Sequence, residues 1–141
     1  MLSPLEFSMS VHNAIIAQFS IFTGNKHAHS SLAGGVNSFE VGLIESIALL
    51  KEKGGLVGYL YYDYLVDHQF AEKFDENEFV CFSMILGEGE GELEIGYGKT
   101  NERKALNRFN ISELLGFLKN DEKRYCISVG GGEILFERAV S

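Results

Sequence analysis

Two cysteines and four histidines are the side chains of this 141-residue chain best suited to chemistry near neutral pH. A thiol enzyme needs a cysteine at a helix N-terminus or beside a histidine, because those settings lower the pKa of the thiol. Cys81 and Cys126 instead lie in apolar runs that predict strands. No CxxC or Cys/His spacing indicates zinc. The pattern therefore predicts two buried free thiols, no metal and no cofactor.

His12 and Asn13 stand side by side where an apolar helix pattern begins, so both could point into a cleft. A helix cap or a buried hydrogen bond is the commoner role for such a pair. His27 and His29 alternate in an extended run and so share one face. Because no third ligand is evident, we expect a surface or interface pair there. His68 lies among acidic residues, where we expect it to be solvated.

A short run, His27–Ala33, leads through Gly34-Gly35 into a second helix pattern. Backbone N–H groups at a helix N-terminus can bind a carbonyl or an anion. Equally, the glycines can serve a turn with positive φ or close helix–strand packing. Ser30 and Ser31 precede the glycines, whereas a hydrolase elbow places the serine between them. The acyl- or anion-binding candidates at this elbow are Leu32, Ala33, Gly34 and Gly35.

Apolar spacing predicts one helix on each side of the elbow. The first has apolar residues at intervals of three and four and ends at Gly24, since glycine tolerates a left-handed turn. We expect this helix to be mostly buried along a face formed by Val11, Ile15, Phe19 and Phe22. Asn37 and Glu40 match a capping box for the second helix, which Gly54-Gly55 ends. Its buried face is formed by Phe39, Leu43, Ile47 and Leu50.

The rest of the chain predicts five strands and a third helix, Asn110–Lys119, with Asn110 and Glu113 in capping-box positions. The expected strands are Leu56–Leu65, Glu78–Leu86, Glu92–Gly98, Arg124–Val129 and Glu133–Arg138. Asp67–Asn77 is polar and predicts a loop. An apolar strand directly after a buried helix favours an α/β layer with a parallel sheet. The predicted class is α/β over residues 1–141, a mixed sheet with packed helices and C-terminal antiparallel hairpins.

The net charge of −8 argues against nucleic-acid binding, which needs clustered Lys and Arg. An acidic partner such as an acyl carrier protein would need a basic patch, for which the candidates are Lys99, Arg103, Lys104 and Arg108. No signal-peptide pattern is seen at the N-terminus, and no apolar run approaches the ~20 residues of a membrane span. We expect a cytoplasmic protein of a single domain.

Three groups of residues in the first third of the chain form a longer motif. They are Phe7, Ser8 and Ser10–Ala14, then Thr23–Asn25, then Ala33, Gly34, Ser38, Phe39, Gly42, Leu43 and Glu45. This motif resembles that of the β-ketoacyl-synthase-like proteins often named chain-length factors. The resemblance implies a thiolase-like half-domain, similar to the N-terminal half of ketosynthases. It also implies a role beside bacterial enzymes of fatty-acid, polyketide or aryl-polyene synthesis.

Two departures from the family pattern shape the expected function. In an active ketosynthase the elbow holds the cysteine that carries the acyl chain, and the matching positions here, Leu32–Gly34, contain none. The histidines that assist condensation belong to a C-terminal half that we expect this chain to lack. The family also has a strand and a helix before the motif, which we expect to be absent. The open sheet edge would then be filled by a partner or a second copy, or removed by rearrangement, unless the chain is a fragment.

The resemblance thus implies a non-catalytic, chain-length-factor-like subunit, in a homodimer or in a heterodimer with a ketosynthase, that helps to shape or bind an acyl chain. The strand before the elbow pairs across a two-fold axis in thiolase-like proteins, which makes His27, His29, Ser30 and Ser31 the interface candidates. One alternative is a small enzyme that acts on acyl thioesters through His12 and Asn13. Another is a degenerate fragment without activity.

Overall fold

The structure is a computed structural model that describes residues 3, 11, 13–64, 79–99 and 109–139. The chain divides into two compact units, Met1–Ser38 and Phe39–Ser141. His12 and the loop predicted at Asp67–Asn77, with His68 inside it, lie outside the described residues. The expectation of a single domain over residues 1–141 stays a prediction.

The first unit carries helix α2 (Ala14–Thr23), which ends as predicted at a left-handed Gly24 (φ 66°). A 3-10 turn, η1 (Gly35–Asn37), follows later in the chain. The strand expected at His27–Ala33 is not formed, because residues 25–34 are neither helix nor strand and residues 25–33 are exposed. A strand needs a neighbour to pair its N–H and C=O groups. The described residues of this unit offer no such neighbour.

Helix α2 is not mostly buried within its unit, contrary to its apolar sequence. Ala14 is its buried residue, whereas Ile15 is 55% exposed and Phe22 is 92% exposed. The exposed large side chains of this stretch are Val11, Ile15, Phe19, Ile21 and Phe22. A short unit cannot enclose a helix that carries this many apolar side chains, because enclosure needs several packed elements. The burial expected for this helix is therefore wrong for the unit taken by itself.

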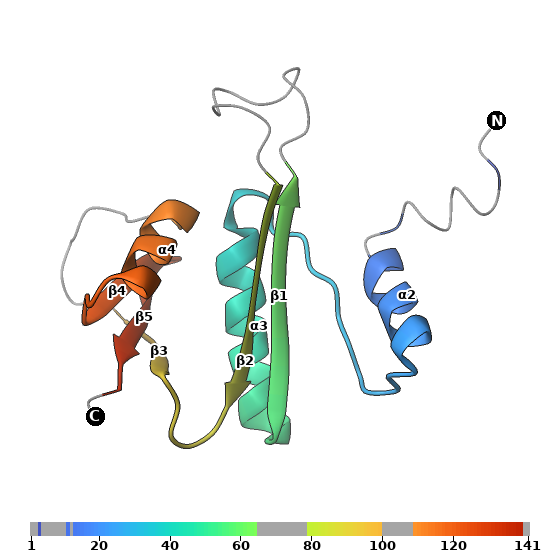
Figure 1. Cartoon of the computed structure of the whole chain (residues 1–141), viewed down its shortest axis with the longest axis horizontal. Helices are drawn as coiled ribbons and strands as arrows, with labels where there is room; N and C mark the ends of the chain where they lie inside the picture. The colour runs from blue at the N-terminus through green and yellow to red at the C-terminus, as the bar shows by residue number, and fades with distance from the viewer. Residues whose placement is uncertain (1–2, 4–10, 12, 65–78, 100–108, 140–141) are drawn as a thin grey trace. The chain divides into compact units, whose positions relative to one another are not determined.

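Apart from its first residue, helix α3 (Ser38–Lys53) belongs to the second unit, together with a two-stranded antiparallel sheet of β1 (Leu56–Tyr64) and β2 (Phe79–Gly87) (Figure 1). Gly54 and Gly55 both have positive φ, at 66° and 78°, and let the chain turn at once from the helix into β1. The helix end and the strand positions agree with the sequence. The parallel pairing expected for β1 is not found among the described strands, because β1 pairs with the strand that follows it.

A second antiparallel sheet has the order β3–β5–β4, with β3 at Leu93–Lys99, β4 at Arg124–Val129 and β5 at Gly132–Arg138. Helix α4 (Ile111–Lys119) lies against this sheet and begins at the predicted cap. Asn110 Oδ1 accepts hydrogen bonds from the N–H groups of Ser112 at 2.9 Å and Glu113 at 3.3 Å. Every described strand pair is thus antiparallel. β4 and β5 form the predicted C-terminal hairpin, whereas β2 and β3 lie in different sheets and do not pair with each other as expected.

The other end of α4 is held by Arg138 of β5. Its Nη2 lies 3.0 Å from Phe117 O, 2.9 Å from Leu118 O and 2.8 Å from Asn120 O, and donates to these carbonyls. The guanidinium carbon also lies 5.5 Å from the centre of the Phe117 ring. A cation at a helix C-terminus satisfies carbonyls that have no partner within the helix and matches the helix dipole.

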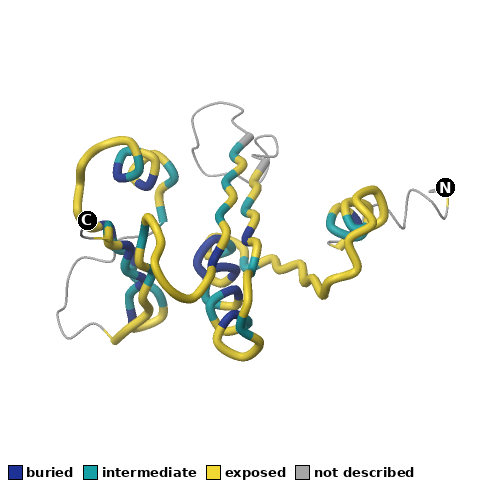
Figure 2. The backbone as a smooth tube through the Cα atoms, turned by 60° about the horizontal axis from the view of Figure 1, so that its bottom comes forward, coloured by how far each residue is buried: buried dark blue, intermediate teal, exposed yellow. Residues whose placement is uncertain are grey.

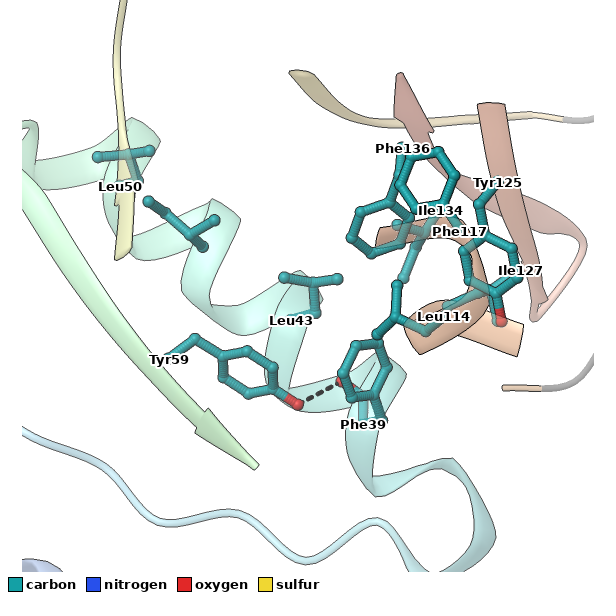
Figure 3. Close-up of a cluster of buried hydrophobic side chains, with 11 residues drawn as sticks. Phe39, Leu43, Leu50, Tyr59, Leu114, Phe117, Tyr125, Ile127, Ile134 and Phe136 are labelled. Carbon is teal, nitrogen blue, oxygen red and sulfur yellow. Dashed lines mark hydrogen bonds between the residues drawn. The ribbon is translucent and has the colours of Figure 1, made fainter. Parts of the chain in front are cut away.

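The core of the second unit joins α3 and the inner face of β1–β2 to the layer of α4, β4 and β5 (Figure 3). Figure 2 shows the buried positions gathered along these elements. The fully buried large apolar residues are Phe39, Leu43, Leu114, Phe117, Ile127, Ile134 and Phe136. Phe39 stacks on Phe109 with ring centres 3.8 Å apart and makes edge contacts with Tyr59 and Tyr61.

Gly42 lets β1 approach α3 closely. A Cβ atom at this position would lie 2.8 Å from Tyr59 Cε2 and 3.1 Å from the Tyr59 hydroxyl oxygen. The Tyr59 side chain is buried, and its hydroxyl donates to Phe39 O at 2.8 Å. The ring therefore cannot move away from a larger residue 42 without losing this hydrogen bond.

Gly42→Ala is expected to lower the free energy of unfolding by about 1–3 kcal/mol, because the added methyl displaces Tyr59 in a packed core. Gly116→Ala in α4 is the matched control, since nothing lies within 4 Å of a Cβ there. That control should raise stability by about 0.5–1 kcal/mol through helix propensity. Urea unfolding followed by circular dichroism measures both. Equal stabilities of the two variants would contradict a packing requirement at Gly42.

Candidate functional site

The elbow at Gly34–Ser38 is closed by its own hydrogen bonds. The Gly34 N–H donates to Ser38 Oγ at 3.0 Å, and the Asn37 N–H donates to Gly34 O at 3.2 Å. The Ser38 N–H donates to Gly35 O, and so does the Ser38 hydroxyl at 2.7 Å. Of the candidate residues, Gly34 therefore already uses its N–H within the turn, as do Asn37 and Ser38 next to them. The assignment of Leu32, Ala33, Gly34 and Gly35 as acyl- or anion-binding residues stays a prediction.

Both glycines of the elbow have a local reason to be glycine. Gly35 has φ 59°, a left-handed conformation that residues with a Cβ rarely adopt. A Cβ at Gly34 would lie 3.2 Å from Asn37 O and 3.3 Å from Ser38 Cα, which is tighter than ordinary contact. Any nucleophilic side chain at position 34 would therefore require its neighbours to shift.

The remaining predicted site residues are not brought together among the described residues. Asn13 is exposed at the start of α2 and makes no side-chain cap bond, and its proposed companion His12 lies outside the described residues. His27 and His29 are exposed, with the His27 N–H donating to Asn25 Oδ1 at 2.9 Å. Ser30 and Ser31 are exposed as well. No group of three metal-ligating side chains exists in the described part of the chain.

The two cysteines lie on strands, as predicted, and they are less buried than predicted. Cys81 is exposed on β2, and Cys126 is half-buried on β4. Alternation along a two-stranded sheet with one covered face explains this exposure for Cys81, because its neighbours Val80 and Phe82 point the other way. Neither cysteine lies at the elbow or at the start of a helix.

Glu40 is a buried carboxylate, whereas the sequence pattern assigns it to a capping box at the start of α3. It is 2% exposed, in the first turn of α3. Its Oε1 accepts the N–H of Phe109 at 3.3 Å, a residue far along the chain, instead of closing a capping box on Asn37. Its Oε2 is buried and has no hydrogen-bond partner among the described residues. One signal was available, since Glu40 stands three, seven and ten residues before the apolar positions Leu43, Ile47 and Leu50.

Three tyrosines of the second unit, Tyr59, Tyr61 and Tyr125, have raised pKa values. Burial raises the pKa of Tyr59 far above its ordinary value and raises the pKa of Tyr125 to about 12. Burial, followed by the charge of Asp63 and a hydrogen bond to it, raises the pKa of Tyr61 to about 12. The negative charge of Glu40 contributes to all three of these pKa values. These hydroxyls therefore act as neutral hydrogen-bond donors and not as bases near neutral pH.

Of the four cations proposed as a basic patch, Lys99 is described and is exposed at the end of β3. Arg103, Lys104 and Arg108 lie outside the described residues, so the patch stays a prediction. Among the helices that the structure describes, none has the length and apolar character needed to cross a membrane.

A family model described as beta-ketoacyl synthase, N-terminal domain, matches residues 1–116 of the chain. The match extends past the elbow and through α3, both strands of the first sheet, β3 and into α4. No curated protein and no solved structure matches the chain.

Glu40→Ala is expected to lower the free energy of unfolding by about 1–3 kcal/mol, because the Phe109 N–H loses its buried acceptor. Glu40→Gln keeps an acceptor for that N–H and replaces the unpartnered oxygen by a neutral amide, so it should be clearly more stable than the alanine variant. Glu45→Gln, at an exposed position of the same helix, is the matched control and should change stability by less than about 0.5 kcal/mol. Urea midpoints that are equally low for both Glu40 variants would indicate a partner that requires the charge.

Stability is expected to fall as the pH rises from about 10 to about 12. An unfolded tyrosine ionises near pH 10, whereas the folded chain holds the Tyr125 and Tyr61 protons up to about pH 12. Unfolding therefore releases protons in this window, and the stabilisation present below it is lost as the pH rises. Tyr125→Phe should make the fall in the urea midpoint shallower. A midpoint that is constant across the window would contradict the assignment.

Proposed function

Because the chain belongs to the family of β-ketoacyl synthase N-terminal domains, we propose that it is a non-catalytic, chain-length-factor-like subunit. It pairs with a ketosynthase or with a second copy and helps to shape or bind an acyl chain. The cellular setting that goes with this proposal is bacterial fatty-acid, polyketide or aryl-polyene synthesis.

The elbow is the observation that carries the proposal. Decarboxylative condensation needs a nucleophile that accepts the acyl group and donors that stabilise the oxyanion. The positions where a ketosynthase keeps its cysteine, Leu32–Gly34, hold no nucleophile. The chain's own cysteines lie on β2 and β4. Three amides of the elbow already donate within the turn, which leaves a frame of the right family without the reactive groups.

Two features of the first unit support a role in pairing and in acyl binding. Helix α2 has no charged residue and exposes Ile15, Phe19 and Phe22, the kind of surface that an acyl chain contacts. The polar segment with His27, His29, Ser30 and Ser31 is exposed and has no strand neighbour among the described residues. Such an exposed segment can pair with a strand of a partner chain.

The first test is the solution mass of the chain, alone and mixed with the ketosynthase encoded nearest to it, measured by light scattering. A stable complex whose mass is the sum of one copy of each protein supports the proposal. A chain that keeps its own mass in the presence of the ketosynthase, and also stays monomeric alone, contradicts it.

Ser30→Asp tests the interface within this proposal. A charge placed in the paired segment should weaken the dimer by roughly tenfold or more, since a buried unpaired charge is costly at an interface. Ser112→Asp adds the same charge at an exposed position of α4 and should leave the dimer intact. Light scattering over a dilution series measures both variants. An unchanged dimer in the Ser30 variant would mean that the interface lies elsewhere.

A further inference from the structure

The second unit is built as two layers that the chain joins at one place. Helix α3 and strands β1 and β2 form the first layer, and helix α4 with strands β3, β4 and β5 forms the second. The elements of one layer precede those of the other along the chain, so the connection between β2 and β3 is the covalent link between the layers. No strand ladder joins the two described sheets. Each layer can therefore move as a body when the contacts across the junction between them give way.

The β2–β3 connection has the properties of a hinge. Its residues 88–91, of sequence Glu-Gly-Glu-Gly, are all exposed, and no hydrogen bond of theirs is found in the described part of the chain. Gly89 has φ 108°, which glycine adopts readily, and nothing lies within 4 Å of a Cβ placed there. Both ends are anchored, because Gly87 closes β2 and Glu92 O accepts the Ala139 N–H at 3.4 Å. Rotation within residues 88–91 therefore breaks no contact of either layer.

Each layer is held together by contacts of its own. In the first layer the Tyr59 hydroxyl donates to Phe39 O at 2.8 Å, which ties β1 to α3. In the second layer Arg138 of β5 donates to three carbonyls at the end of α4, and the Phe117 and Tyr125 rings stack with centres 5.9 Å apart. These contacts do not cross the junction. Both layers can therefore stay folded while the junction opens.

Glu40 makes a polar contact across the junction, and its geometry is unfavourable. Its Oε1 accepts the N–H of Phe109, just before α4, at 3.3 Å, which is longer than most such bonds. Its Oε2 is buried without a partner among the described residues. A buried carboxyl oxygen without a partner costs free energy whether the group is charged or neutral, and the cost is larger for the charge. Opening the junction returns this oxygen to water, so Glu40 disfavours the closed state relative to a neutral residue of the same shape.

We infer that the second unit opens and closes about the hinge at residues 88–91, with the stack of Phe39 on Phe109 favouring the closed state and Glu40 favouring the open one. The ring stack, with centres 3.8 Å apart, holds the layers together by burial of apolar surface. The carboxylate opposes that burial. Opening exposes apolar side chains of both layers in one step, so the unit has a second state with a different binding surface. This motion does not depend on the proposed function.

Amide hydrogen exchange of the unmodified chain, followed by nuclear magnetic resonance, tests the opening. An amide that is protected by the closed junction needs only the local opening to exchange, whereas an amide in a strand ladder needs the loss of its sheet. The Phe109 N–H is such a junction amide, and it should exchange at least roughly tenfold faster than the slowest amides of both sheets. Equal rates for Phe109 and both ladders would mean that the junction opens only with global unfolding, which would overturn the inference.

Glu40→Gln tests the role of the carboxylate. The amide keeps an acceptor for Phe109 and removes the charge, so the open population should fall roughly tenfold. Methyl relaxation dispersion at Leu43 of α3 and Leu114 of α4, both fully buried in the shared core, measures this population without using the Phe109 N–H. Glu45→Gln makes the same change at an exposed position of α3 and should leave the dispersion unchanged. Equal open populations in the two variants would overturn the role given to Glu40.

Gly91→Ala tests the hinge. A Cβ there would meet Leu93 O at 3.6 Å, an ordinary contact, so the closed state can accept it. Alanine narrows the conformations that the hinge can adopt when open, and the open population should fall about two- to fivefold. Gly96→Ala on β3, where nothing lies within 4 Å of a Cβ, is the matched control and should leave the population unchanged. With both variants shown to be folded by circular dichroism, an equal effect of the two changes would overturn the hinge assignment.

Discussion

The packing of Phe39 is the constraint on which the rest of the second unit depends. Its carbonyl accepts the Tyr59 hydroxyl at 2.8 Å, and its ring stacks at 3.8 Å on Phe109, just before α4. One residue at the start of α3 thus holds both the first strand and the segment that leads into the second layer. Gly42, one turn later, has to be small because Tyr59 must reach that carbonyl. For this reason α3, the β1–β2 sheet and the second sheet share one hydrophobic core, although no backbone hydrogen-bond ladder joins the two described sheets.

Glu40 is the next residue after Phe39 and adds a hydrogen bond to the contact between Phe39 and Phe109. Its Oε1 accepts from the backbone of Phe109, and its second oxygen is buried without a partner among the described residues. A carboxylate in such a place usually fixes which segments come together, since its removal leaves a buried N–H donor, here that of Phe109, without an acceptor. The elbow residues just before α3 are held by local bonds from Ser38. The start of α3 and the elbow before it therefore contain two kinds of residue: Ser38 shapes the turn, and Glu40 joins distant elements.

Local chemistry made the element ends predictable, and long-range contacts decided the rest. Gly24, Gly54-Gly55 and the Asn110 cap act within a few residues, and the structure has each of them where the sequence places it. The strand expected at His27–Ala33 needs a neighbour that sequence alone cannot supply, and α2 needs a covering surface. The capping box predicted at Asn37 and Glu40 is not formed, because the Glu40 carboxylate instead accepts a hydrogen bond from the N–H of Phe109, 69 positions away. The family is recognisable from the motif, whereas the acyl-binding role of the elbow rests on the resemblance.

Arg138 sets an order on how this chain can finish folding as it leaves the ribosome. The carbonyls at the end of α4 accept hydrogen bonds from the Arg138 guanidinium, which lies 18 to 21 positions later in the sequence and is therefore synthesised after them. Until β5 has been synthesised and paired, that end of the helix can bind only water, and its last turn will fray. The helix and the hairpin of β4 and β5 should therefore become protected from proteases in one step. A nascent chain halted between them would carry a helix that begins well at Asn110 and has no fixed end.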